Sequence, residues 1–532
     1  MNRRVFGWRH LGVCAAVIGV FMPHPAHAQN DTSAPLSAID WLDKPLPLAR
    51  LPRAPQTAPG PGAKIDEPSV ASTGSAPRIT IRPLDGAAPR TVGLVPETMT
   101  GIAPDLWRAS ETGVLVDLIT DLDDLELPAA NALLFTVLLA NATVVDDRAQ
   151  DALTRARVHK LLQLGAVDPG LALVEQAGGR DDPALFDLWA DLSLLAGTED
   201  AVCTVLARAP YLSRNIGLRI FCAARSGDWD TAALTLGSAK ALALLPNETL
   251  DVLDRFLNPD LFEDAAPLPV PRRIDPLTFR LFETIGEPLP SGPLPRAYAV
   301  ADLRDLRGWK SQLQAAERLT RAGALPDNRL LGLYTERKPA ASGGIWDRVD
   351  AVQRFDTALN TRSAEAVAKT MPQAWRAMRD AGLEVSFAAA FHDRLAKIPL
   401  TGRARRTQLE IGLLSPDYEL AALAGAQVPL GPHTDVILAT ATGTAADRAP
   451  EDALARAVHD VFAGDTAKPD LVAMVRAGRL GEALLHTLDA LRAGARGDTG
   501  ALRGALGTLR ALGLEDTARR AALQILLAQA PR

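Results

Sequence analysis

The stretch Gly227-Asp-Trp-Asp-Thr-Ala232 decides the fold class, because its composition is that of a tight turn between two helices. Gly227 suits the left-handed position after a helix, Asp228 or Thr231 can cap the next helix, and Ala232 lets two helices approach closely. Similar stretches, each with a Gly followed four or five positions later by a small residue, occur at residues 165–170, 197–201, 478–483 and 513–518. A recurring turn of this kind predicts consecutive helical hairpins.

The composition of the chain agrees with helix packing. Hydrophobic residues make up 47% of the 532 residues and aromatic residues only 5%, so the core must be built mainly from Ala, Leu and Val. Ala and Leu have the strongest intrinsic preference for helices, whereas aromatic strand formers are scarce. The sequence therefore predicts an all-α fold.

The turn at residues 227–232 resembles the turn between the two helices of tetratricopeptide-type repeats. The full signature of that family, with large aromatics and a closing Pro at a period of about 34 residues, is absent. The resemblance implies stacked antiparallel helix pairs in a TPR-like or Sel1-like solenoid, whose concave face usually binds proteins. The chain as a whole also resembles uncharacterised exported proteins of alphaproteobacteria, a likeness that brings no known activity with it.

The N-terminus has the three zones of a secretory signal peptide. Arg3, Arg4 and Arg9 make a basic start, residues 11–22 form a short apolar stretch, and Ala26-His27-Ala28 supplies the pattern that a signal peptidase cleaves. We expect residues 1–28 to be a signal peptide that is removed before Gln29. The mature chain is then expected to be periplasmic.

Composition divides the mature chain into four further segments. Residues 29–103 are rich in Pro, Ala, Gly, Ser and Thr, which predicts a mostly disordered leader. Residues 260–299 are Pro-rich, and Pro at that density excludes long helices and favours an extended strap. Residues 104–259 and 300–532, on either side of this strap, are predicted to form two helical-repeat blocks.

The leader contains an apolar island around Ile39, Trp41 and Leu42. These residues either pack back on the folded body or form a short docking peptide for a partner protein. The sequence alone leaves both interpretations open.

The charge of the chain argues against a nucleic-acid partner, and its hydropathy argues against a membrane anchor. The net charge is −6 and no basic block stands out, which argues against a nucleic-acid partner. Residues 127–145 are rich in Ala, Leu and Val but include Asn131, Thr136, Asn141 and Thr143, a polar density that suits a core helix better than a membrane span. We therefore expect no transmembrane anchor after signal cleavage.

Cleavage leaves two cysteines, Cys203 and Cys222, which fall on consecutive predicted helices. In an oxidising compartment this pair can close into a disulfide, worth roughly 3 kcal/mol on the chain-entropy model. Two separate buried thiols are the alternative. No other Cys or close His joins the pair, so a metal site is not expected here.

The sequence contains no catalytic constellation that we would assign. Gly-x-Ser-x-Gly, His-Glu-x-x-His, P-loop and dinucleotide motifs do not occur. The dipeptides His392-Asp393 and His459-Asp460 resemble part of the metal site of HD phosphohydrolases, but we interpret them as solvent-facing helix residues. We expect no catalytic residue, metal or cofactor.

The most unusual local sequence runs through residues 334–348. Its candidate site residues are Tyr334, Arg337, Lys338, Ser342, Gly343, Gly344, Trp346 and Arg348. Free backbone N–H groups where a helix begins can hold an anion, with the basic residues assisting. The alternative is a structured loop in which Ser342 caps the helix and Trp346 lies in the core.

Together these features predict a non-catalytic periplasmic scaffold or accessory protein that binds an envelope or periplasmic protein through a helical-repeat surface. The alternative is an enzyme acting on envelope polymers, or a ligand-binding protein, with its site near residues 334–348. The two hypotheses differ in what they require of the surface. A scaffold needs an exposed binding face, whereas an enzyme needs a pocket that gathers titratable groups with shifted pKa values.

Overall fold

The predicted turn at residues 227–232 joins helix α8 (Ile216–Arg225) to helix α9 (Trp229–Ala241). Gly227 has φ 83°, in the left-handed region, and the Asp228 side chain accepts a hydrogen bond from the Thr231 N–H at 3.2 Å. The glycines that open the four similar stretches also have positive φ values, at Gly165, Gly197, Gly478 and Gly513. The recurring turn therefore correctly marks where one helix ends and the next begins.

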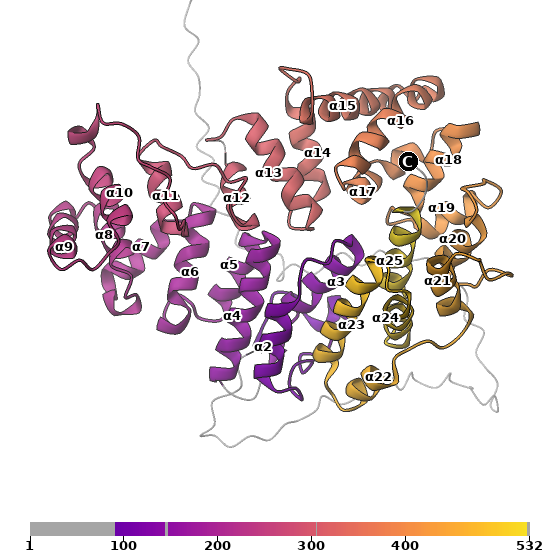
Figure 1. Ribbon diagram of the computed structural model, residues 1–532, viewed down its shortest axis with the longest axis horizontal. Helices are drawn as coiled ribbons and strands as arrows, with labels where there is room; N and C mark the ends of the chain where they lie inside the picture. Colours follow the sequence, from indigo (N-terminus) through magenta and orange to yellow (C-terminus); the bar gives the residue numbers. More distant parts are fainter. Residues whose placement is uncertain (1–90, 144–146, 305, 529–532) are drawn as a thin grey trace, which may run out of the picture. The chain divides into compact units, whose positions relative to one another are not determined.

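In this computed structural model, the described residues are 91–143, 147–304 and 306–528. They belong to one compact unit and form 25 α-helices, with one short two-stranded ladder, so the all-α prediction is confirmed for this part of the chain (Figure 1). The predicted signal peptide and almost all of the predicted leader lie outside the described residues.

The first group of helices follows the strand β1 (Thr91–Val92), which pairs antiparallel with β2 (Ala142–Thr143). Besides α8 and α9 it comprises α1 (Glu97–Thr100), α2 (Thr112–Asp121), α3 (Pro128–Leu139), α4 (Asp147–Leu164), α5 (Val167–Gln176), α6 (Pro183–Ala196), α7 (Glu199–Arg208) and α10 (Asn247–Leu257). From α4 to α10, each helix packs against the next one along the chain.

Short helices interrupt the Pro-rich segment that follows α10. They are η2 (Pro259–Phe262), α11 (Pro276–Thr284), η3 (Arg296–Tyr298) and α12 (Ala299–Asp302), with η1 (Pro210–Leu212) lying earlier, between α7 and α8. Helices α11 and α12 both pack against α6, and η3 packs against α4. The segment therefore runs back along the first group of helices.

The remaining helices form the second group. They are α13 (Trp309–Arg321), α14 (Asp327–Glu336), α15 (Ile345–Thr361), α16 (Ala364–Asp380), α17 (Glu384–Leu395), α18 (Gly402–Leu413), α19 (Tyr418–Ala424), α20 (Thr434–Ala441), α21 (Ala453–Ala463), α22 (Pro469–Arg476), α23 (Leu480–Ala495), α24 (Thr499–Ala511) and α25 (Glu515–Ala528). The hairpins α15–α16 and α23–α24 are antiparallel neighbours along the chain.

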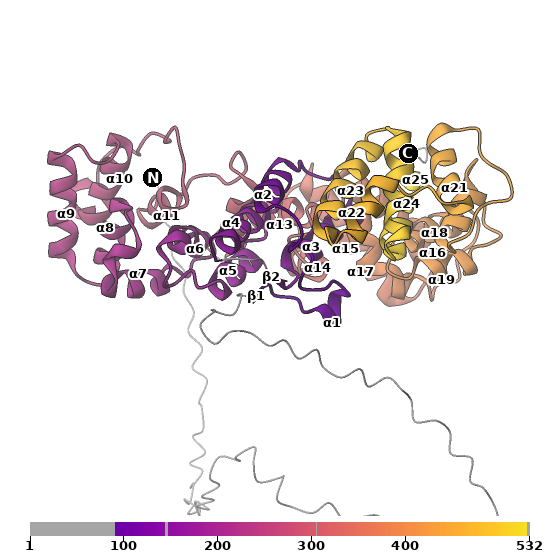
Figure 2. The same ribbon diagram turned by 90° about the horizontal axis from the view of Figure 1, so that it is seen from below.

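The last helices of the chain pack against the first ones. Helix α25 contacts α3, and α23 contacts both α2 and α3, so the ends of the colour scale meet in both views (Figures 1 and 2). The Gly481 N–H donates to the Leu106 carbonyl at 2.9 Å, and a Cβ at Gly481 would overlap the buried ring of Trp107. A glycine is required here because the two backbones approach so closely.

Helix α3 occupies most of the apolar stretch 127–145. It buries Ala130, Leu134 and Val137, together with Asn131, which is 5% exposed. The expected core placement is therefore confirmed for this helix. None of the helices described in 91–143, 147–304 and 306–528 is both long and apolar enough to cross a membrane.

A fully buried arginine joins β1 to the helices behind it. The Arg157 guanidinium on α4 donates to the carbonyls of Leu138, Val92 and Ala140 at 2.7, 2.9 and 2.7 Å. Burial lowers the pKa of Arg157 to about 9. These hydrogen bonds satisfy carbonyls at the end of α3 and in β1 that would otherwise be buried without partners.

Cys203 on α7 and Cys222 on α8 form a disulfide, as the sequence predicts, and the alternative of two separate thiols is wrong. Both cysteines are buried, at 3% and 4% exposure. The bond therefore links two packed neighbouring helices and closes a loop with a sequence separation of 19 residues.

We predict that the double variant Cys203→Ser/Cys222→Ser is less stable than the oxidised chain by roughly 3 kcal/mol, because the unfolded chain regains loop entropy. Equilibrium urea unfolding with and without dithiothreitol measures the effect. Reductant should destabilise the wild type and leave the double variant unchanged. A wild type whose unfolding midpoint ignores reductant would contradict the prediction.

A second prediction concerns Asp191 on α6. Burial, with the nearby carboxylates of Asp275 and Asp187, raises the pKa of Asp191 to about 7. The folded chain therefore holds this proton at pH values where the unfolded chain, with a pKa of about 3.9, has already lost it. It follows that wild-type stability falls as pH rises from about 4 to about 7.

We predict that Asp191→Asn removes this loss. At pH 8 the variant should be more stable than wild type by up to about 4 kcal/mol, since one pKa unit corresponds to about 1.4 kcal/mol. At pH 4 the two should be similar. Thermal unfolding across this pH range is the measurement, with substitution of the exposed Asp181 by Asn as the control. Parallel pH curves for wild type and Asp191→Asn would refute this explanation.

Candidate functional site

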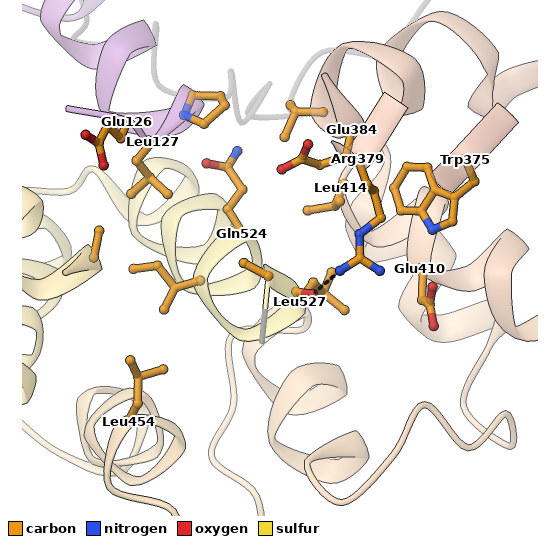
Figure 3. Close-up of a pocket in the computed structure, with 15 residues that line it drawn as sticks. Glu126, Leu127, Trp375, Arg379, Glu384, Glu410, Leu414, Leu454, Gln524 and Leu527 are labelled. Carbon is orange, nitrogen blue, oxygen red and sulfur yellow. Dashed lines mark hydrogen bonds between the residues drawn. The ribbon is translucent and has the colours of Figure 1, made fainter. Parts of the chain in front are cut away.

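A cavity of about 280 Å³ lies beside the contact between α25, the last described helix, and α3. Its walls come from the start of α3, from α16, α17 and α18, and from α25 (Figure 3). About half of the lining surface is apolar, and Leu127, Leu414, Leu454 and Leu527 contribute to it. Packing of α25 against α3 closes this side of the cavity.

The polar groups of this cavity are mainly charged. Burial raises the pKa of Glu410, while the nearby Arg379 opposes that rise. Arg379 donates to the Leu527 carbonyl at 3.4 Å, and its guanidinium lies 5.8 Å from the centre of the Trp375 ring (Figure 3). Gln524 accepts the Ala129 N–H at 3.0 Å, which fixes the start of α3 to α25.

The cavity gathers titratable groups, as an active site does. However, its volume is at the low end for small-molecule sites, which are typically about 300–1000 Å³. Arg379 and Gln524 each bond to a backbone group of the opposite wall. Their role in joining α16, α3 and α25 therefore explains these two polar groups without a ligand.

The second candidate region is the predicted site at residues 334–348. Tyr334, at the end of α14, is 1% exposed, and Arg348, in the first turns of α15, is half-buried. Arg337 and Lys338 are exposed, as are Ser342, Gly343 and Gly344. The structure therefore separates the predicted residues into an inner group and an outer group.

The inner group is organised by Glu317 on α13, a residue that our sequence reasoning missed. Glu317 is 3% exposed and accepts hydrogen bonds from the Tyr334 hydroxyl at 2.5 Å and from Arg348 Nη2 at 2.7 Å. Burial beside Glu317 raises the pKa of Tyr334 well above its usual value, so the phenol stays protonated. Arg348 is thus bound to a carboxylate of its own chain.

An acidic side chain of the chain itself also lies at the start of α15. Gly344, with φ 57°, is the N-cap residue and carries no side chain, and the carboxylate of Asp347, in the first turn, accepts the N–H of the preceding Gly343 at 2.8 Å. The proposed Ser342 cap is therefore wrong, because Gly344 is the N-cap residue and no side chain caps the helix. Trp346 is half-buried against Trp309, with ring centres 5.2 Å apart.

Two hollows border this loop. One, of about 490 Å³, lies between α13 and the loop and is lined by the loop backbone at 342–344 with Lys310, Arg321 and Glu317. The other, of about 1010 Å³, is an open groove along α15 and α16. Its side chains include Lys338, Trp346, Asp350, Arg354, Thr357, Lys369 and Gln373.

The remaining predicted residues do not form a site. His392 is 8% exposed and packs beside Gly412, so its solvent-facing placement is wrong, and burial lowers its pKa. His459 lies on α21, where it contacts the Ala446 carbonyl at 3.0 Å. Within the part of the chain that the structure describes, no group of three or more His, Cys, Asp or Glu residues is arranged to hold a metal. Ile39, Trp41 and Leu42 lie outside the described residues.

Comparisons with known proteins identify no relative of this chain. No family model, curated protein or solved structure matches the chain.

We predict that Glu317→Gln lowers the free energy of unfolding by roughly 3 kcal/mol, because it leaves the Arg348 guanidinium half-buried without its carboxylate. Urea unfolding measures this change. The matched control is Glu336→Gln, which breaks the exposed pair between Glu336 and Arg337 and should cost about 0.5 kcal/mol or less. Equal effects of the two substitutions would show that Glu317 does not organise the loop.

Proposed function

We propose that the protein is a non-catalytic scaffold or accessory protein of the bacterial periplasm, exported by its signal peptide, that binds an envelope protein through a helical-repeat surface. In this proposal the hairpins form a TPR-like or Sel1-like solenoid behind a disordered leader. The Cys203–Cys222 disulfide supports an oxidising compartment. No basic block is present for nucleic acid.

The observation that carries the proposal is the open groove of about 1010 Å³ along α15 and α16. Helix–helix grooves of this kind accept peptide segments of a partner. The groove offers charges of both signs from Asp350, Arg354 and Lys369, and an aromatic surface from Trp346. These groups suit recognition of a polar peptide that carries its own charges.

The lining of this groove favours binding over catalysis. Its side chains are Lys, Asp, Arg, Gln, Thr and Ser with Trp346, Pro339 and alanines, and they include neither His nor Cys. The hydroxyls of Thr357, Thr361 and Thr370 donate to backbone carbonyls of their own helices, so none of the three is paired with a general base. Arg354 already pairs with Asp350 at 2.7 Å, whereas Lys338 and Lys369 are further exposed cations that a partner can reach.

Ligand binding at the hollow of about 490 Å³ is the second candidate function, including action on an envelope polymer. Lys310 and Arg321 are exposed at this hollow and face the loop backbone at 342–344. They favour an anionic group. Asp347 and Glu317 oppose it, because each places a carboxylate at the same loop.

In-vivo photocrosslinking tests the two candidates against each other. A photoreactive amino acid at Thr357 or Lys369 should capture one or two envelope proteins, whereas the same probe at exposed Asp251 on α10 should capture none of them. Lys369→Glu should reduce capture from Thr357 several-fold, and Lys310→Glu should not. Capture that is equal at all three probe positions, or absent from the groove, would contradict partner binding there.

The same crosslinking experiment also tests the candidate docking peptide. Replacing Ile39, Trp41 and Leu42 with Ala should lower capture if the leader contributes to the same partner. Unchanged capture would restrict binding to the helical body. Glycan fragments captured at Lys310, with no protein at Thr357, would favour the second candidate function.

A further inference from the structure

Helix α9 and the turn after it expose four large apolar residues to solvent. Trp229 is 51% exposed and Leu234 is 74% exposed, and Leu242 and Leu244, in the turn after the helix, are 67% and 49% exposed. The inner side of α9 buries Ala232, Leu236 and Ala239. Leu234 therefore lies on the outer side of the helix, where a surface helix usually carries a polar residue.

This helix lies at an end of the packed hairpins. It packs against α8 and α10, and both views place it at the outer edge of the first group of helices (Figures 1 and 2). An array of hairpins normally ends in a repeat with a polar outer face, because each repeat buries its apolar surface on its neighbours. The end formed by α25 meets this need through its contact with α3.

The outer face of α9 has a shape that fits itself. With about 3.6 residues per turn, Asp230, Leu234, Gly237 and Ala241 fall on one side of the helix, and all are exposed. Gly237 is surrounded by open space, since a Cβ placed there meets no atom within 4 Å. Two α9 helices can pack antiparallel about a two-fold axis that passes midway between Leu234 and Gly237. Leu234 of each helix then lies over Gly237 of the other helix.

The charges on α9 are also complementary to themselves in this arrangement. Asp228 and Asp230 mark the start of the helix, and Lys240 lies near its end. An antiparallel pair brings the acidic start of each helix to the basic end of the other, and it also opposes the two helix dipoles. Lys240 pairs with Asp254 at 2.8 Å but keeps 41% exposure, so a second carboxylate can reach it.

We propose that this face is the interface between two copies of the chain, which pair through antiparallel α9 helices about a two-fold axis. The pairing buries Leu234 of both copies, together with Gly237 and Ala241. The second copy also covers the end of the array of hairpins at α9, just as α3 covers the end formed by α25. The disulfide between α7 and α8 stiffens the support against which α9 packs.

Sedimentation equilibrium of the purified, oxidised chain tests the proposal. Wild type should show a reversible equilibrium between one and two copies, and Leu234→Asp should weaken the dimer at least tenfold. Leu420→Asp is the matched control, because Leu420 on α19 is 66% exposed and lies outside the proposed interface, so it should leave the dimer unchanged. A wild type that stays monomeric up to about 100 µM, in the range of weak association, would overturn the proposal.

Gly237→Gln separates the interface from any effect on folding. Glutamine favours a helix more than glycine does, and open space surrounds this position, so the variant should unfold at the same or a higher temperature. The added side chain should nevertheless weaken the dimer, because it fills the place of the opposing Leu234. If neither Gly237→Gln nor Leu234→Asp weakens the dimer, the two copies pair through another surface.

Charge exchange tests the antiparallel direction. Asp230→Lys should weaken the dimer several-fold, and adding Lys240→Asp should restore part of the affinity. Failure of the second substitution to restore any affinity, in a double variant with wild-type thermal stability, would contradict the antiparallel pairing.

Discussion

The packing of α25 against α3 determines how the other helices of the described chain can be arranged. An Ala- and Leu-rich helix buries one face on each neighbour, so a row of such helices leaves an apolar face at each end. The chain covers one of these ends with its own first helices, and the contact is fixed by the hydrogen bond from Ala129 to Gln524 and by the close approach at Gly481. The cavity lined by Arg379 and Glu410 lies beside this contact, and packing of α25 against α3 closes one side of it.

Buried carboxylates complete the connections that apolar packing begins. Glu199, at 1% exposure, accepts two hydrogen bonds from Arg280 at 2.9 and 2.8 Å, and so joins α7 to the segment that runs back along it. Glu317 does the same between α13, α14 and α15. Apolar surfaces of similar shape can slide past one another, whereas a buried pair is satisfied in only one register. Glu317 therefore positions the loop at 334–348, which borders the groove on α15 and α16.

Local features of this chain could be predicted from the sequence, and long-range ones could not. The all-α fold, the glycine turns and the disulfide each depend on residues that are close in sequence or on overall composition. The closure of α25 on α3 depends on residues nearly 400 positions apart, as in the bond from Ala129 to Gln524, and no local pattern records it. Glu317 did leave a signal, since it follows Leu313 and Ala316 on the apolar side of α13, but its partners lie on other helices. Ser342 was a reasonable cap by residue type, but Gly344 is the N-cap residue of α15 and no side chain caps the helix there.

The two surfaces proposed for binding differ in chemistry, and that difference assigns them different roles. The outer side of α9 exposes Leu234, and the turn after the helix exposes Leu242 and Leu244, which is unfavourable in water whenever no partner is bound. This side of α9 therefore suits a contact that persists between copies of the chain. The groove on α15 and α16 instead mixes charged and hydroxyl side chains with Trp346 and alanines, and its charged groups are solvated when it is empty. A mixed surface of this kind can bind and release a partner, which fits the proposed scaffold role.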